Sequence, residues 1–182
     1  IARGMKYLHA HNIIHRDLKP GNILLNKDYY PFITDFGMSK ICKFGHSQSQ
    51  SLYAGTIQYD APEILKAEKY NRKVDVYAFG ILMFEVVTQR VAYSNISNQF
   101  ELMQKVQNGY RPDFRDIKIN ENIKNLIIQC WSDDPKARPE FSEIFNKLAY
   151  KISDNDDENF FLDGVDVDCL DDYVSEIIEA DD

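Results

Sequence analysis

Apolar side chains recur at helical spacing along most of the chain. Residues 1–11 place Ile1, Met5 and Leu8 on one face of a short helix. The segment 73–89 is apolar on nearly every side, which is typical of a helix buried in the middle of a domain. Three amphipathic helices are predicted after it, with faces formed by Phe100, Met103 and Val106, by Ile123, Leu126, Ile127 and Cys130, and by Phe141, Ile144, Phe145 and Leu148.

Two short apolar runs predict strands between the first helix and the buried one. Ile23–Leu25 and Phe32–Thr34 flank a polar segment that contains Pro31, and we interpret them as a small hairpin. Residues 36–60 are rich in Gly, Ser and Gln without a period, so a long loop is expected there. The predicted fold class is therefore mainly α, a helical bundle around a buried central helix with short β-hairpins.

The composition fits a single globular domain. The chain has 182 residues, 44% of them apolar, and no apolar run approaches the 18 residues of a membrane span. Its three cysteines are far apart and form no CxxC or Cys/His cluster, so neither a disulfide framework nor a zinc site is indicated. A reducing compartment fits this pattern, and we expect a cytoplasmic protein.

The net charge of −8 is unevenly distributed. Residues 1–152 carry a net charge of +5, whereas residues 153–182 carry 13 acidic side chains and no Lys or Arg. No basic stripe typical of nucleic-acid binding is present. We therefore expect a domain over 1–150 and an acidic tail over 151–182. The tail is expected to be disordered or to dock on a partner or on the basic domain.

The segment His15–Asn22, HRDLKPGN, concentrates chemically useful groups. It holds the carboxylate of Asp17, the ammonium of Lys19 and the carboxamide of Asn22 within six positions. A proline and a glycine between them prevent a regular helix, so the three groups can converge in a loop.

A second carboxylate follows the predicted hairpin. Asp35 stands thirteen positions after Asn22, and the hairpin would return the chain so that the two face each other. A carboxylate and an amide oxygen are ligands suited to Mg²⁺. Asp17 then remains free to accept a proton from a hydroxyl, and Lys19 can neutralise charge on a phosphoryl group. These are the parts that phosphoryl transfer requires.

These motifs resemble the C-terminal lobe of a eukaryotic-type protein kinase, over about residues 1–150. HRDLKPGN matches the catalytic loop of that family, residues 35–37 match its DFG triplet, and residues 61–63 match its APE triplet. The resemblance implies a kinase-like C-lobe fold, ATP and Mg²⁺ as cofactors, and protein substrates. It assigns Asp17 as catalytic base, Lys19 to the γ-phosphate, Asn22 and Asp35 to Mg²⁺, and Leu24 to the floor of the adenine pocket.

The same resemblance implies supporting roles for other residues. Glu63 and Arg138 resemble the buried ion pair of the family, and Asp75 resembles the acid that braces the catalytic loop. Arg16 resembles the arginine that receives a phosphate on the activation segment, and His15 is expected to pack against Phe36.

Two segments favour a tyrosine-kinase-like serine/threonine kinase. Residues 55–63 are similar to the GTxxYxAPE pattern of serine/threonine kinases, in which the hydroxyl of Thr56 would lie beside the catalytic Asp and Lys. Residues 130–141 resemble the CW..DP..RP.F pattern of tyrosine and tyrosine-kinase-like groups. Asp60 stands where Met or another apolar residue is usual, a departure that concerns substrate preference rather than the chemistry.

The remaining candidates have an ordinary structural interpretation beside a functional one. Ser47, Ser49 and Ser51 form either a flexible polar loop or phosphorylation sites whose charge would pair with Arg16. The histidines at 9, 11 and 46 are expected at the surface. The three cysteines are expected to be inert thiols.

Two function classes remain open. The first is an enzyme that transfers phosphate from ATP to Ser or Thr hydroxyls of proteins in signalling. The second is a non-catalytic, kinase-like interaction module. The sequence contains no Gly-rich phosphate loop and no VAIK-type lysine. We therefore expect a truncated kinase that is weak or inactive as this chain alone.

Overall fold

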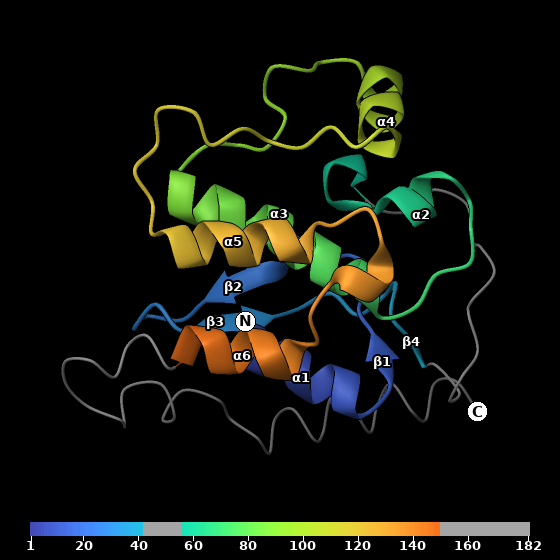
Figure 1. The fold of residues 1–182 in the computed structure, drawn as a ribbon. Coiled ribbons are helices and arrows are strands. Elements are labelled where there is room, and N and C mark those ends of the chain that lie inside the picture. The colour runs from blue at the N-terminus through green and yellow to red at the C-terminus, as the bar shows by residue number, and fades with distance from the viewer. Residues whose placement is uncertain (42–55, 150–182) are drawn as a thin grey trace.

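The computed structural model describes residues 1–41 and 56–149 and shows a mainly helical fold (Figure 1). The helices are α1 (Ala2–Ala10), α2 (Pro62–Leu65), α3 (Lys73–Thr88), α4 (Gln99–Gln107), α5 (Glu121–Cys130) and α6 (Phe141–Ala149). The strands are β1 (Ile13–Ile14), β2 (Ile23–Leu25), β3 (Pro31–Ile33) and β4 (Lys40–Ile41), and the 3-10 turns are η1 (Pro20–Asn22), η2 (Ile57–Tyr59) and η3 (Pro135–Ala137). The predicted fold class, a mainly α domain like the kinase C-lobe, is confirmed.

Helix α3 is the centre of the hydrophobic core. Every residue from Val74 to Phe84 is buried, as the all-round apolar pattern of this segment predicts. Helix α5 packs along α3. The two backbones approach closely at Gly80, where an added Cβ would lie 2.9 Å from Cys130 Cβ. Burial raises the pKa of the Cys130 thiol to about 12, which disfavours the reactive thiolate form.

The other helices cover two sides of this central pair. Helix α1 packs against α6 below α3 and α5 in the view of Figure 1, and α2 packs against α4 above them. Turn η2 contacts both α3 and α4. The chain therefore passes from α1 through β1 into residues 15–22, and turn η2 reaches α3 and α4.

Two small antiparallel sheets frame the segment 15–22. Strand β2 pairs with β3 in the register Ile23↔Ile33 and Leu24↔Phe32, so the predicted hairpin is present with its second strand starting one residue early. Strand β1 pairs with β4, with Ile13 opposite Ile41. The expectation of an irregular segment over 36–60 is thus wrong at β4 and η2, since two or three residues are too few to show a period.

The predicted face of α4 needs a correction. Phe100 was expected to share a buried face with Met103 and Val106, but its side chain is 62% exposed and Leu102 is buried instead. The side chain of Asn98 accepts hydrogen bonds from the amides of Phe100 and Glu101 and so caps the helix. This cap marks where α4 begins, and the buried face of the helix is formed by Leu102 and Val106.

None of the helices within 1–41 and 56–149 is both long and apolar enough to cross a membrane. The predicted acidic tail lies outside the described residues.

Candidate active site

The carboxylate of Asp17 is held between two neighbouring side chains. Its Oδ2 lies 2.6 Å from Lys19 Nζ and accepts a hydrogen bond of 2.9 Å from Asn22 Nδ2. The same amide nitrogen donates to the carbonyl of Asp17 at 2.8 Å. Turn η1 makes this possible, because the amide of Asn22 donates back to the carbonyl of Lys19. The three groups that the sequence brings within six positions therefore converge on one carboxylate.

Asp75, in the first turn of α3, fixes the backbone just before Asp17. Its carboxylate accepts hydrogen bonds from the amides of His15 at 2.9 Å and Arg16 at 2.8 Å, and it is fully buried. A carboxylate is favoured at the start of a helix by the exposed amide dipoles there. Arg16 has a φ of 69°, an uncommon backbone conformation for a side chain of its size. The two hydrogen bonds stabilise that conformation.

His9 is a third partner of the same carboxylate and was expected at the surface. The structure corrects this: His9 is only 5% exposed, and its Nε2 lies 2.7 Å from Asp75 Oδ2. Its ring also packs edge-to-face on Phe141 of α6, at 4.8 Å between centroids. The sequence held a signal for this, since His9 stands four residues after Met5 and so shares the apolar face of α1.

The segment after β3 returns to the end of the catalytic loop. The amide of Thr34 donates to the carbonyl of Asn22 at 2.9 Å, which places Asp35 next to a residue bound to that loop. His15 also helps to hold this segment, because its Nε2 lies 3.1 Å from the Thr34 carbonyl oxygen. Its ring is 5.1 Å from the ring of Phe36. The hairpin thus joins the two motifs through backbone contacts.

The oxygen atoms here fit a hard divalent cation. Asn22 uses its Nδ2 for both hydrogen bonds to Asp17, so its Oδ1 points to the other side and accepts from none of the residues described. Asp35 is exposed, and among the residues described its carboxylate accepts only a weak bond of 3.4 Å, at Oδ1, from the Gly37 amide. An amide oxygen and a carboxylate are what Mg²⁺ takes when it keeps several waters. Within 1–41 and 56–149, no group of three or more His, Cys, Asp or Glu forms an alternative metal site.

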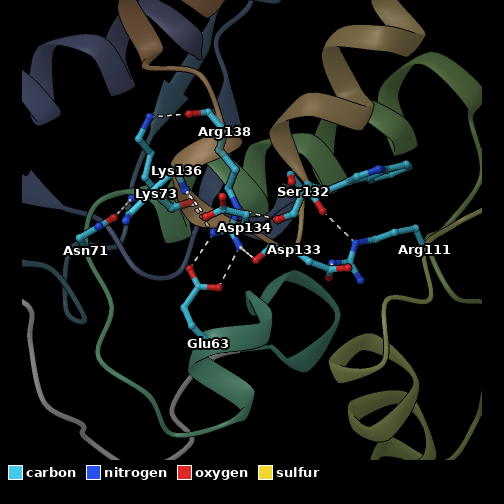
Figure 2. A network of polar contacts seen from close by, with 10 residues as sticks. Glu63, Asn71, Lys73, Arg111, Ser132, Asp133, Asp134, Lys136 and Arg138 are labelled. Atoms are coloured by element: carbon cyan, nitrogen blue, oxygen red, sulfur yellow. Dashed lines mark hydrogen bonds and ion pairs between the residues drawn. The ribbon is translucent and has the colours of Figure 1, made fainter.

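Glu63 and Arg138 form a buried ion pair with two parallel hydrogen bonds. Arg138 Nη1 and Nη2 donate to the two carboxylate oxygens of Glu63 at 2.6 and 2.8 Å (Figure 2). The guanidinium also donates to the carbonyls of Ser132 and Lys73, so it is satisfied on several sides. The pair joins α2, which follows η2, to η3 and the start of α3.

The sequence matches the profile of the protein tyrosine and serine/threonine kinases over residues 1–148. The chain belongs to this protein kinase family.

Several curated protein kinases are similar to the chain. A probable serine/threonine-protein kinase of Dictyostelium discoideum is 40% identical over 149 residues, which cover 82% of this chain and 11% of that protein. In Arabidopsis thaliana, the serine/threonine-protein kinase VIK is 37% identical over 81% of the chain and 35% of its own length. The serine/threonine/tyrosine-protein kinase HT1 is 37% identical over 79% of the chain and 36% of its length. The chain thus spans between about a tenth and about a third of these relatives.

The other residues that the kinase resemblance singled out occupy varied positions. Leu24 on β2 is 58% exposed, so its side chain is open to a ligand. The Nη1 of Arg16 donates to the carbonyl of Met38 at 3.3 Å, and its guanidinium lies over the ring of Tyr70. Thr56 is half-buried at the start of η2, and its hydroxyl makes no hydrogen bond to a described residue. The serines at 47, 49 and 51, and His46, lie outside the residues that the structure describes.

The sequence marks Asp60 as a departure from the usual kinase pattern, but it does not predict that this side chain is buried. The side chain is 9% exposed, directly after η2. Burial and the negative charge of Asp17 raise the pKa of its carboxyl group to about 6, against the smaller opposing effects of Arg16 and Lys19. A second acidic group therefore lies within electrostatic reach of Asp17.

Proposed function

We propose that the protein is a serine/threonine kinase that transfers the γ-phosphoryl group of ATP to hydroxyl groups of protein substrates. The observation that carries this proposal is the position of the Asp17 carboxylate, held by Lys19 and Asn22 beside the segment that bears Asp35. Membership of the kinase family supports it independently.

In the proposed reaction the substrate hydroxyl oxygen attacks the γ-phosphorus, and the bond between that phosphorus and the bridging oxygen of ADP breaks. Asp17 accepts the proton that the hydroxyl loses. Lys19 supplies positive charge next to Asp17 and is close enough to reach an incoming phosphoryl oxygen. Asn22 holds the carboxylate in place through its Nδ2, so that the base points in one direction before the substrate arrives.

The residues present fit Mg²⁺ and a nucleotide. Asn22 Oδ1 and the carboxylate of Asp35 would hold the cation, which neutralises charge on the phosphates when it is bound. The exposed Leu24 side chain offers an apolar surface for the adenine ring. His15 and Phe36 pack together and keep the start of the DFG segment beside the catalytic loop.

Specificity for Ser and Thr rests on sequence patterns and relatives. Lys19 stands two residues after Asp17, and residues 55–63 follow the serine/threonine pattern. Two of the three relatives described above are named as serine/threonine kinases, and HT1 is named for tyrosine as well. We further propose a cytoplasmic protein in which residues 151–182 form a separate acidic tail that binds a partner.

The test is phosphate transfer by the full-length protein. Wild-type protein with Mg²⁺ and radiolabelled ATP should phosphorylate a mixture of peptides, with label on Ser and Thr in phosphoamino-acid analysis. Asp17→Asn should lower kcat by at least about 100-fold, because a positioned general base contributes that much or more. The matched control is Asp116→Asn, which removes an exposed carboxylate elsewhere.

Two results would overturn the proposal. Undiminished transfer by Asp17→Asn would exclude this carboxylate as the base. No transfer by folded full-length protein would favour the non-catalytic interaction module.

A further inference from the structure

The side chain of His9 makes one hydrogen bond among the described residues, and its partner is the carboxylate that holds the catalytic loop. Nε2 lies 2.7 Å from Asp75 Oδ2, whereas Nδ1 is buried and has no hydrogen-bond partner in the described part of the chain. The imidazole as a whole is buried, so the contact is shielded from water. Any hydrogen-bonding effect of His9 on the rest of the domain is therefore exerted through Asp75.

The direction of this hydrogen bond is set by aromatic packing. The ring of His9 lies edge-to-face on Phe141, at 4.8 Å between centroids, and Phe141 packs in the same way on Phe79 of α3 at 5.3 Å. Close packing of this kind holds a side chain in one orientation. The imidazole therefore directs Nε2 at Asp75 without any contribution from a substrate.

The carboxylate of Asp75 needs such a donor, because its own rotation is loosely defined. The last torsion of an aspartate has broad wells rather than three sharp ones. His9 and the amide of His15 both contact Oδ2, and Oδ1 accepts from the amide of Arg16 at 2.8 Å. Without the contact to His9, two backbone hydrogen bonds alone would hold this orientation.

That orientation matters because of the backbone conformation that it stabilises. Arg16 has a φ of 69°, in the left-handed region, and such residues persist only where the surrounding contacts impose them. Asp17 is the next residue, so a change at Arg16 would turn its carboxylate away from Lys19 and Asn22. Misplacing a reacting group by about 1 Å can lower a rate by about 100-fold.

We propose that His9 is a positioning residue for phosphoryl transfer, which acts through Asp75 on the backbone that directs the Asp17 carboxylate. The inference rests on the proposed kinase function. Because this role requires no contact with a substrate, the effect of His9 falls on the chemical step and leaves substrate binding unchanged. A histidine that only filled the core would change the stability of the protein and not the rate of the folded enzyme.

The test separates the hydrogen bond of His9 from its packing. In the full-length protein, His9→Phe keeps an aromatic ring beside Phe141 and removes the donor. His9→Gln removes the ring and keeps an amide donor near the position of Nε2. With Mg²⁺, ATP and a Ser peptide that the wild type phosphorylates, His9→Phe should lower the single-turnover rate by at least about 10-fold while both KM values stay nearly unchanged. His9→Gln should recover most of that loss.

A second readout does not depend on activity. The amides of His15 and Arg16 donate to Asp75, so their hydrogen exchange, followed by NMR, reports on the orientation of that carboxylate. Relative to the amides of α5, both should exchange at least about 10-fold faster in His9→Phe and return toward the wild-type rate in His9→Gln.

Gly80→Ala is the control for a loss of stability alone. This substitution crowds the contact between α3 and α5, away from the catalytic loop, and should leave the single-turnover rate of the folded protein unchanged. All rates are measured at a temperature at which circular dichroism shows each protein to be folded. If His9→Phe does not fold, His9→Leu serves as the second variant without a donor.

The outcomes distinguish this inference from the proposed function. An unchanged transfer rate in the folded variant without a donor overturns the role of His9, and so does an equal loss of rate in Gly80→Ala. Absence of phosphate transfer by folded wild-type protein is instead a failure of the proposed kinase function. The exchange of the two amides then still decides whether His9 orders the loop.

Discussion

His9 Nε2 lies 2.7 Å from Asp75 Oδ2, and both side chains are buried. The same carboxylate accepts hydrogen bonds from the backbone amides of His15 and Arg16. Helix α1, helix α3 and the catalytic loop therefore meet at this one group. Because an ionised carboxylate only accepts hydrogen bonds, Nε2 is the donor in this contact, and among the residues described His9 Nδ1 has no hydrogen-bond partner. A side chain of α1 therefore helps to position the loop that carries Asp17.

Replacing His9 by alanine should destabilise the protein. Asp75 would lose one donor in a buried site, and the packing of the imidazole on Phe141 would be lost as well. We expect the free energy of unfolding to fall by about 2–3 kcal/mol, measured by urea denaturation. His11→Ala, at the residue directly after the same helix, is the matched control, and because His11 is exposed its effect should stay within about 0.5 kcal/mol. Equal effects of the two substitutions would contradict this role of His9.

The ion pair between Glu63 and Arg138 allows a double-mutant test. Glu63→Gln or Arg138→Met alone leaves a buried charge without its partner, and each should lower the free energy of unfolding by about 3–5 kcal/mol. The double variant should be less destabilised than the two single losses added together. Thermal unfolding of all three proteins measures this.

A surface pair provides the comparison. Arg115 contacts Asp113 at an exposed position, and Arg115→Met should leave the melting temperature nearly unchanged. Additive losses at Glu63 and Arg138 would show that the two side chains act independently.

The features that the sequence predicted well depend on contacts between residues that are close in the chain. The contact of Asp17 with Lys19 and Asn22 spans six positions and one turn, so residue types and spacing suffice to expect it. The all-round apolar pattern of α3 likewise fixes its place at the centre of the core. The return of the chain beside Asn22 follows from a hairpin that the two apolar runs already indicate.

What the sequence missed depends on contacts between distant segments. His9 is buried because α6 packs on α1, and Asp60 directly follows η2, which contacts both α3 and α4. Strand β4 exists only through its pairing with β1, since two residues carry no periodic signal. Phe100 is exposed because α4 turns Leu102 and Val106, which stand four residues apart, to the core, and apolar spacing alone did not select that face.

Gly80 tests the close packing of α3 on α5. Alanine would favour the helix by about 1 kcal/mol on intrinsic propensity. Its Cβ would, however, lie 2.9 Å from Cys130 Cβ and 3.2 Å from the amide nitrogen of Trp131, and backbone atoms cannot move away easily. Overpacking of this kind costs about 1–3 kcal/mol, so we expect Gly80→Ala to lower the melting temperature.

Gly21 supplies the control for that substitution. An added Cβ there would meet only Lys19 Cε at 3.8 Å, an ordinary contact. Gly21→Ala should therefore leave the melting temperature unchanged or raise it slightly, because alanine restricts the unfolded chain. A stabilising effect of Gly80→Ala would show that α3 and α5 can separate at this point without loss.

Asp60 should make stability depend on pH between about 4 and 6. Its folded-state pKa of about 6 lies above the ordinary value of 3.8, so the folded protein binds this proton more tightly than the unfolded chain does. The contribution of this proton to the stability of the folded protein is therefore fully present below about pH 4. It is lost as the pH rises through about 6. A difference of about two pH units corresponds to about 3 kcal/mol in the free energy of unfolding.

Asp60→Asn removes the titrating group and isolates this effect. The free energy of unfolding of the variant minus that of the wild type should increase between pH 4 and pH 7, by about 3 kcal/mol, when both are measured by urea denaturation at each pH. Asp116→Asn, at an exposed position, should give a difference that stays flat over the same range. A flat difference for Asp60→Asn as well would mean that Arg16 and Lys19 neutralise the carboxylate in the folded protein.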